Sequence, residues 1–496
     1  MSHRRRALWS GAAVALVLSL QAGAAWAAET LADAVALAYE TNPTLQAQRA
    51  NQRALDETYV QARTALRPTA DVGVTATYTD ASTFGESDSG SLSLSAEQPL
   101  YTGGRAIRGI DAAHADVLQG RENLRAVEAQ ILASVVQAFV DVRRDTEALR
   151  INQENVAVLQ RQLDEASARF EVGEITRTDV AQAEARLAAS QASLAAAQAN
   201  LSVSRAAYAA VVGQSPGDLA PEPPLPGVPT TFDEAINVAE RENPEVRAAQ
   251  RGEEAAEARV AQARAQYNPT VGLRATYGTS DTLDDFASNF TDNDSITASA
   301  TVSVPLFTGG LNGSRVRQAL ERSNSARVAV EAARREVLRD VSQSWATLLS
   351  ARAALAANEE QVRAAQIAAE GVRQEAQVGL RTTLDVLNAE LELRNAQLAL
   401  INARRDQYVA TALLLSAMGR LEAVNLVAGV EVYDPARNFN RVRNKGAVLW
   451  EPVVEAIDRI AAPTGEHPDN DTDAPIDTQL EAIATNPQSS PVQPPR

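Results

Sequence analysis

The sequence predicts a mainly α-helical protein with a membrane β-barrel, built from two tandem repeats that each hold a β-hairpin and long coiled-coil-like helices. Three observations lead to this prediction. The chain repeats itself, each half contains two runs with period-two alternation, and each half contains a very long helical pattern.

The internal repeat is visible when the chain is compared with itself. Leu31–Pro43 matches Phe232–Pro244 at an offset of 201 residues, and both segments end in Asn-Pro. The corner Gln98–Gly104, read QPLYTGG, matches Val304–Gly310, read VPLFTGG, at an offset of 206. The same offset holds at two later Val-Gly turns, so the repeat keeps its frame along most of each half. A repeat of this length predicts two copies of one structural plan.

Each half contains two strand-like runs of about ten residues in which apolar and polar positions alternate. This length and alternation fit a membrane-spanning strand with lipid on one face and water on the other. A surface hairpin of a soluble protein shows the same alternation, so that alternative stays open on these residues alone. The apolar positions are Val72, Val74, Ala76, Tyr78, Leu92, Leu94, Ala96, Val271, Leu273, Ala275, Tyr277, Ile296, Ala298, Ala300, Val302 and Val304.

The number of strands predicts an oligomer. One chain supplies four strands, whereas a membrane tolerates no open sheet edge and about eight strands are the practical minimum for a barrel. We therefore expect each chain to share its barrel with other copies.

The helical patterns are unusually long. One runs from Leu31 to about Leu66, and a longer one from Gly104 to about Phe170 places apolar residues at steps of three and four. At about 1.5 Å per residue the longer helix spans roughly 100 Å, which would cross much of a periplasm. A short turn and a further helix ending near Gly213 follow. An ordinary helix bundle is the alternative, but its helices are seldom so long.

The first residues are typical of a secretory signal peptide. Arg4–Arg6 precede the apolar run Gly11–Leu20, and Ala25–Ala27 is a small-x-small cleavage site. A membrane anchor is the alternative interpretation. Cleavage would change the net charge from −17 to −20, and this acidity argues against nucleic acid as a partner. We expect an exported protein that is periplasmic, secreted or in the outer membrane.

The composition does not favour an enzyme. The chain has no Cys and three His, and it contains no glycine-rich phosphate loop and no nucleophile elbow. We therefore expect no catalytic residue, no metal and no cofactor. A scattered Ser, His and Asp that meet in space remain the alternative.

These features resemble the TolC family of outer-membrane factors. The resemblance covers about Leu31 to Leu426 and is carried by the doubled layout, the two Pro-Leu-aromatic-x-Gly-Gly corners and the turns at Arg169–Val180 and Val378–Leu387. It implies a homotrimer in the bacterial outer membrane, with a shared 12-stranded barrel and an α-helical tunnel that extends into the periplasm. It also implies docking through a periplasmic adaptor (membrane fusion) protein to an inner-membrane ABC or proton-driven transporter. The function implied is type I protein secretion or small-molecule efflux, with the cargo chosen by the transporter.

The predicted domain boundaries combine the repeat with this resemblance. They are a signal peptide at 1–27, a first repeat at 28–220, a Pro-rich joint at 221–230, a second repeat at 231–431, an equatorial segment at 432–462 and a disordered tail at 463–496.

The turns carry the candidate gate. Thr176–Asp179 and Thr382–Asp385 both fit a capping box, so helix initiation is one interpretation of Asp179 and Asp385. Arg381 matches Ile175 of the first repeat, so the repeated fold does not require a cation there.

The family resemblance implies that Arg381 links to Thr178 and Asp179 at the periplasmic gate, and a solvated arginine is the alternative. This sequence departs from the family pattern twice, with Ala376 in place of a tyrosine and Asn388 in place of an inward aspartate. The link through Arg381 is therefore expected to matter more here.

The resemblance also implies that the tips of the turns dock the adaptor. The residues concerned are Val172, Gly173, Val378, Gly379 and Leu380.

Two other classes of protein stay open. A periplasmic adaptor also uses long helical hairpins, but it carries one hairpin and biotinyl-like β-domains. A coiled-coil structural protein of the envelope needs neither a signal peptide nor four amphipathic strands.

Overall fold

The computed structural model describes residues 28–81, 85–283, 294–427 and 429–465. The predicted signal peptide, nearly all of the predicted tail and parts of the two hairpin loops lie outside the described residues. Within the described ranges, no helix has the length and apolar character needed to cross a membrane.

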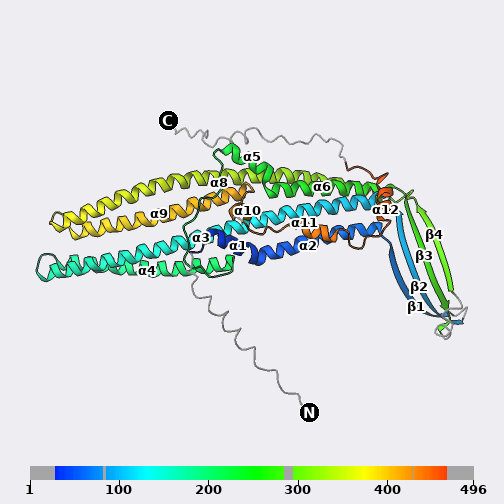
Figure 1. The fold of residues 1–496 in the computed structure, drawn as a ribbon, viewed down its shortest axis with the longest axis horizontal. Helices are drawn as coiled ribbons and strands as arrows, with labels where there is room; N and C mark the ends of the chain where they lie inside the picture. The colour runs from blue at the N-terminus through cyan, green and yellow to red at the C-terminus, as the bar shows by residue number, and fades with distance from the viewer. Residues whose placement is uncertain (1–27, 82–84, 284–293, 428, 466–496) are drawn as a thin grey trace, which may run out of the picture. The chain divides into compact units, whose positions relative to one another are not determined.

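The two halves contain the same elements in the same order (Figure 1). The first half contains α1 (Leu31–Thr41), α2 (Pro43–Arg63), the 3-10 turn η1 (Thr64–Leu66), β1 (Thr69–Ala81), β2 (Gly85–Tyr101), α3 (Arg105–Glu171) and α4 (Arg177–Val212). The second half contains α5 (Phe232–Glu242), α6 (Pro244–Arg264), η2 (Ala265–Tyr267), β3 (Thr270–Asp281), β4 (Asp294–Ser303), α8 (Leu311–Gln377) and α9 (Thr383–Ala417). The short helices α10 (Ala423–Leu426), α11 (Pro435–Val442) and α12 (Glu451–Arg459) follow. The predicted duplication of a hairpin and long helices is confirmed.

The long helices α3 and α8 each contain 67 residues, which corresponds to about 100 Å. Their equal length shows that the repeat extends to the helical part of the fold.

The first helical pattern of each half is divided at an Asn-Pro pair, although the sequence predicts one continuous helix from Leu31 to Leu66. Asn42 is extended, and its side-chain oxygen accepts the backbone N–H groups of Thr44 and Leu45. The ring of Pro43 has no N–H to donate to the preceding helix, so a new helix begins there. Asn243 caps α6 in the same way.

The four strands form one antiparallel sheet in the order β1-β2-β3-β4 (Figure 1). The register places Val72, Leu94, Tyr277 and Ile296 in one row across the sheet. The large apolar side chains that the strands expose all belong to the face of this row: Val72, Val74, Tyr78, Leu94, Leu273, Tyr277, Ile296 and Val302. The sheet therefore has one apolar face open to its surroundings and one polar face.

The described residues fall into two compact units, and the long helices contribute to both. In the unit that contains residues 135–224 and 365–401, α4 returns beside the second half of α3. Its core is a cluster of apolar and small side chains: Leu159, Ala166, Ala183, Leu187 and Leu387. Small alanines let the helices approach closely, which explains the low aromatic content of 4%.

The other unit contains the sheet and a core between α5, α8 and α9. Phe232 and Trp345 pack with their ring centroids 6.1 Å apart. They share a buried cluster with Leu348, Leu414 and Met418. This core joins the start of the second repeat to its own long helices.

The C-terminal helix α12 is anchored in the same unit by two buried acidic residues. Asp458 accepts hydrogen bonds from the backbone N–H and hydroxyl of Thr102 and from the N–H of Gly104, at 2.5, 2.9 and 3.2 Å. Glu451 accepts from Arg63 and Arg67 at 2.8 and 3.0 Å. A carboxylate at the N-terminus of α3 satisfies backbone donors that have no partner within the helix.

Candidate functional site

The two long hairpins end in the same type of turn. The N–H of Gly173 donates to Phe170 and the N–H of Glu174 to Arg169, both at 2.9 Å. Gly379 and Leu380 repeat this pair of bonds on Ala376 and Glu375. Each glycine has a positive φ, +79° at Gly173 and +76° at Gly379, as the Schellman motif requires.

The tips of these turns expose apolar side chains. Val172, Val378 and Leu380 are 78%, 71% and 75% exposed. A Cβ added at Gly173 or Gly379 would meet no atom within 4 Å, so the glycines are explained by their backbone angle and not by close packing. The predicted docking residues thus form two small apolar tips of similar shape.

The capping boxes predicted after the two turns are confirmed. Asp179 Oδ2 accepts from the N–H and hydroxyl of Thr176 at 2.9 and 2.8 Å. Asp385 makes the same two bonds with Thr382 at 3.1 and 2.9 Å. These bonds lower the pKa of both carboxyl groups, so both aspartates are charged at neutral pH.

Arg381 is exposed and bonded within its own turn. Its Nε donates to Glu375 Oε2 at 2.8 Å, and this contact together with the charge of Asp385 raises its pKa. Thr178 is exposed in the first turn of α4, beside the capping box of Asp179. Within the chain, Arg381 therefore has Glu375 as its partner, which the sequence did not indicate.

Asn388 joins the two hairpins. Its Oδ1 accepts from Arg186 of α4 at 3.0 Å, and the neighbouring Leu387 is buried against α3 and α4. Two residues farther along α9, buried Glu390 pairs with Arg373 of α8. Sequence reasoning missed Arg186, Arg373 and Glu390, because nothing in their spacing distinguishes them from solvated charges of a helix.

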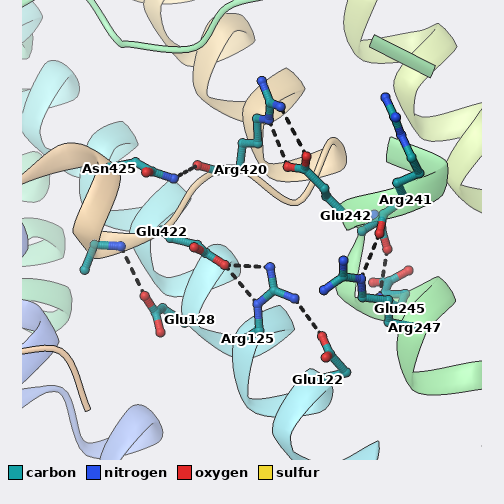
Figure 2. Close-up of polar contacts among 12 residues, drawn as sticks. Glu122, Arg125, Glu128, Arg241, Glu242, Glu245, Arg247, Arg420, Glu422 and Asn425 are labelled. Atoms are coloured by element: carbon teal, nitrogen blue, oxygen red, sulfur yellow. Dashed lines mark hydrogen bonds and ion pairs between the residues drawn. The ribbon is translucent and has the colours of Figure 1, made fainter. Parts of the chain in front are cut away.

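A second polar cluster lies at the other end of α9, where the chain leaves the helix (Figure 2). Arg125 of α3 is held between Glu122 and Glu422, both at 2.7 Å. Arg420 pairs with Glu242 at the end of α5 at 2.9 Å. These contacts fasten the end of the second repeat to α3 and to α5, and we call this group of ion pairs the equatorial joint.

Glu128 completes the equatorial joint. Its Oε1 accepts the N–H of Ala423, the first residue of α10, at 3.1 Å. Burial raises the pKa of this carboxyl, and the negative charge of Glu422 raises it further, against the opposing effect of the Ala423 N–H, Arg49 and Arg125.

The part of the chain that the structure describes contains no group of three or more His, Cys, Asp or Glu side chains placed to hold a metal ion. The candidate site is thus a pair of apolar tips with charged turns, on long helices that continue from an amphipathic sheet. This combination defines the class of outer-membrane channel proteins.

Comparison with known proteins also indicates an outer-membrane channel protein. The family model described as outer membrane efflux protein matches residues 34–214 and 235–420, most of both repeats. The chain is 35% identical to the outer membrane efflux protein BepC of Brucella suis over 443 residues, covering 89% of this chain and 96% of that protein. It is 29% identical to the outer membrane protein TolC of Vibrio cholerae, covering 84% of this chain and 98% of that protein.

Solved structures share the fold. The outer membrane protein VceC of Vibrio cholerae aligns with a TM-score of 0.67 at 24% identity, covering 78% of this chain and 96% of that one. The open-state MtrE outer membrane channel of Neisseria gonorrhoeae aligns with a TM-score of 0.68 at 25% identity, covering 79% and 90%.

The chain belongs to the outer membrane efflux protein family. The resemblance to TolC-type outer-membrane factors, the fold class and the outer-membrane location expected from the sequence are confirmed. The family supports a channel-tunnel for export and does not favour a periplasmic adaptor or a structural coiled coil.

The raised pKa of Glu128 leads to a prediction on stability. A carboxyl whose pKa is raised by folding stabilises the folded state below its ordinary pKa, near 4.5, and loses this contribution as the pH rises through the folded pKa. Glu128→Gln keeps an oxygen that accepts from Ala423 and removes the charge. We expect the melting temperature of Glu128→Gln in detergent, relative to that of the parent, to increase as the pH is raised from about 4.5 to 7.5.

Glu128→Ala is the control, because it also removes the acceptor and should melt below the parent throughout. If Glu128→Gln melts as low as Glu128→Ala at pH 7.5, the carboxylate charge is not the costly feature of this site.

Proposed function

We propose that three copies of this chain assemble into one export duct, with a shared 12-stranded barrel in the outer membrane and a helical tunnel in the periplasm. The observation that carries the proposal is the sheet, which has one exposed apolar face. Within the described residues, its outer strands β1 and β4 each pair with one other strand. Because hydrocarbon cannot solvate free backbone N–H and C=O groups, these edges need further strands. Three sheets of four strands supply a closed barrel within the sizes known for such proteins.

The tunnel receives its substrates from other proteins in this proposal. Helices of about 100 Å extend toward the inner membrane, where an adaptor protein and an ABC or proton-driven transporter deliver cargo to the tips. Relatives of the chain are named both for efflux, as BepC is, and for secretion of an alkaline protease, as AprF of Pseudomonas aeruginosa is. We therefore assign the chain the role of a conduit without catalytic residues, whose partners choose the cargo.

We further propose that the charged turns close the periplasmic end. Arg381 of the second turn and Thr178 of the first are exposed, and Asp179 is partly exposed. The cap bonds of Asp179 both use Oδ2, which leaves Oδ1 for an arginine. Asp179 is thus suited to begin its helix and to bind Arg381 at the same time. Asp385 and Asn388 lie about one turn apart in the first part of α9, which begins two residues after Arg381.

The assembly itself is the first test. Outer membranes that contain the chain should release a detergent-stable trimer that conducts ions in planar bilayers, with the mass measured by mass photometry. A monodisperse monomer with a closed sheet would contradict the proposed architecture.

The tips provide the second test. Replacing both Gly173 and Gly379 with leucine strains a backbone that needs positive φ and reshapes both apolar tips. We expect export in cells to be abolished while trimers still assemble. The milder pair Val172→Ile and Val378→Ile keeps the turns and the apolar surface and should export normally. Normal export by the double leucine variant would rule out the tips as the docking site.

The gate provides the third test. We expect Arg381→Ser to raise single-channel conductance in planar bilayers at unchanged trimer yield, because it removes the cation that holds neighbouring turns together. Asp179→Ala should do the same, and the double variant should add little, since both changes remove one interaction. High salt should weaken the closed state of the parent.

Glu375→Gln is the matched control for the gate, because it removes the partner that Arg381 has within its own turn. Its conductance should stay near the parental value. An Arg381→Ser channel that conducts like the parent at every salt concentration would show that Arg381 is an ordinary surface residue.

A further inference from the structure

The polar face of the sheet carries very few charges. Most of its described residues are serine, threonine or glycine, as in the rows Gly73–Ser93–Gly278–Ser295 and Thr75–Ser91–Ser280. On the strands that the structure describes, the charged side chains of this face are Asp71, Glu97 and Arg274.

These three residues lie together. Glu97 of β2 is directly opposite Arg274 of β3, and Arg274 Nη2 donates to Glu97 Oε2 at 2.7 Å. In the adjacent row, Asp71 of β1 is opposite Ser95, whose hydroxyl donates to Asp71 Oδ2 at 2.7 Å. The side chains of Arg274 and Glu97 remain 62% and 51% exposed. The cluster is therefore open to whatever fills the space on this side of the sheet.

The cluster lies at the helix-proximal end of the strands. Asp71 and Arg274 are near the beginnings of β1 and β3, just after η1 and η2, and Glu97 is near the end of β2, before the corner that leads into α3. It thus lies where the barrel would meet the tunnel.

The repeated fold does not require these charges. At the offset of 201, Asp71 matches Gly272 and Arg274 matches Gly73. At the offset of 206, Glu97 matches Ser303. Each charged position is uncharged in the other half, so the same backbone forms without it, and a role in folding does not explain the cluster.

We propose that Asp71, Glu97 and Arg274 form a net-negative collar in the water-filled lumen, which concentrates positively charged solutes where the tunnel meets the barrel. This inference rests on the proposed closure of three sheets into one barrel, with the apolar face toward lipid and the polar face inward. Arg274 and Glu97 cancel each other's charge, and Asp71 supplies the excess. Three copies repeat this excess around the lumen. The other residues that the described strands place on this face are uncharged, so on these strands no further wall charge masks the field of the collar.

The chain has no cysteine, so a single introduced thiol reports the local potential without interference. Thr276→Cys places a thiol in the row of Asp71 and Ser95 and two residues from Arg274. Trimers in lipid vesicles are treated with membrane-impermeant thiosulfonates, one carrying a trimethylammonium group and one a sulfonate. The ratio of the two modification rates, divided by the ratio for a free thiol in solution, measures the preference for cations.

We expect this normalised ratio to exceed one in the parent. It should fall about threefold in Asp71→Asn at about 10 mM salt and rise in Arg274→Gln by a similar factor. The double variant Glu97→Gln with Arg274→Gln removes the ion pair without changing the net charge and should stay close to the parental ratio. At about 1 M salt all of these variants should converge.

Thr75→Cys is the distant control on the same face, four residues or about 13 Å along β1 from Asp71. Its ratio should respond less to each variant. If both thiols are modified but Asp71→Asn and Arg274→Gln leave the ratio at Thr276→Cys unchanged, the collar is refuted and the duct is not. If neither thiol is reached by these reagents, the polar face is not a lumen, and both the collar and the proposed duct are refuted.

Discussion

The requirement that backbone hydrogen-bonding groups be paired in hydrocarbon governs this structure. The sheet pairs β1 with β2, β2 with β3 and β3 with β4, so that in the part of the chain that the structure describes β1 and β4 each have one neighbouring strand. In water such edges would be solvated, but next to lipid they need further strands. The exposed row that contains Val72 and Ile296 also indicates a membrane location, because an apolar face of this kind is stable only against lipid or another protein. The proposed shared barrel, and through it the proposed tunnel, rest on these two facts.

The two repeats use one backbone plan and differ in where they place charge. Both halves have the Asn-Pro break, the Gly-Gly corner, a 67-residue helix and a Schellman turn followed by a capping box. Arg381 and Arg274 occur only in the second copy, and the equivalent positions of the first copy are Ile175 and Gly73. Features common to both halves are thus explained by folding, whereas features of one half are the places to look for gating and selectivity.

The equatorial joint combines ion pairs between distant parts of the chain with a partly buried acid. Arg125 and Arg420 each pair with a carboxylate from a distant part of the sequence, and they hold the end of α9 against α3 and α5. Beside them, Glu128 is a partly buried acid whose hydrogen bond to Ala423 compensates for part of the cost of burial. The tips, in contrast, are exposed and held by local bonds, as the proposed docking and release of partners would require.

The sequence by itself determined the elements and their order. Period-two alternation predicted all four strands, the Val-Gly turns predicted where the hairpins reverse, and the spacing from Thr176 to Asp179 predicted the capping box, because each of these features depends on residues within a few positions of one another. The division of the first helix at Asn42 was missed, although the following proline is a local signal for it. The family and the outer-membrane location were also predicted, from motifs that recur in both halves.

Only the tertiary structure decided which charges meet. The pairing of β2 with β3 joins the hairpins of the two halves and brings Glu97 to Arg274, 177 positions farther along the chain. The bond from Arg186 to Asn388 spans 202 positions, and that from Ala423 to Glu128 spans 295. A charged residue on a helix has the same local pattern whether it is solvated or paired, so its partner and its burial emerge only when distant segments pack together.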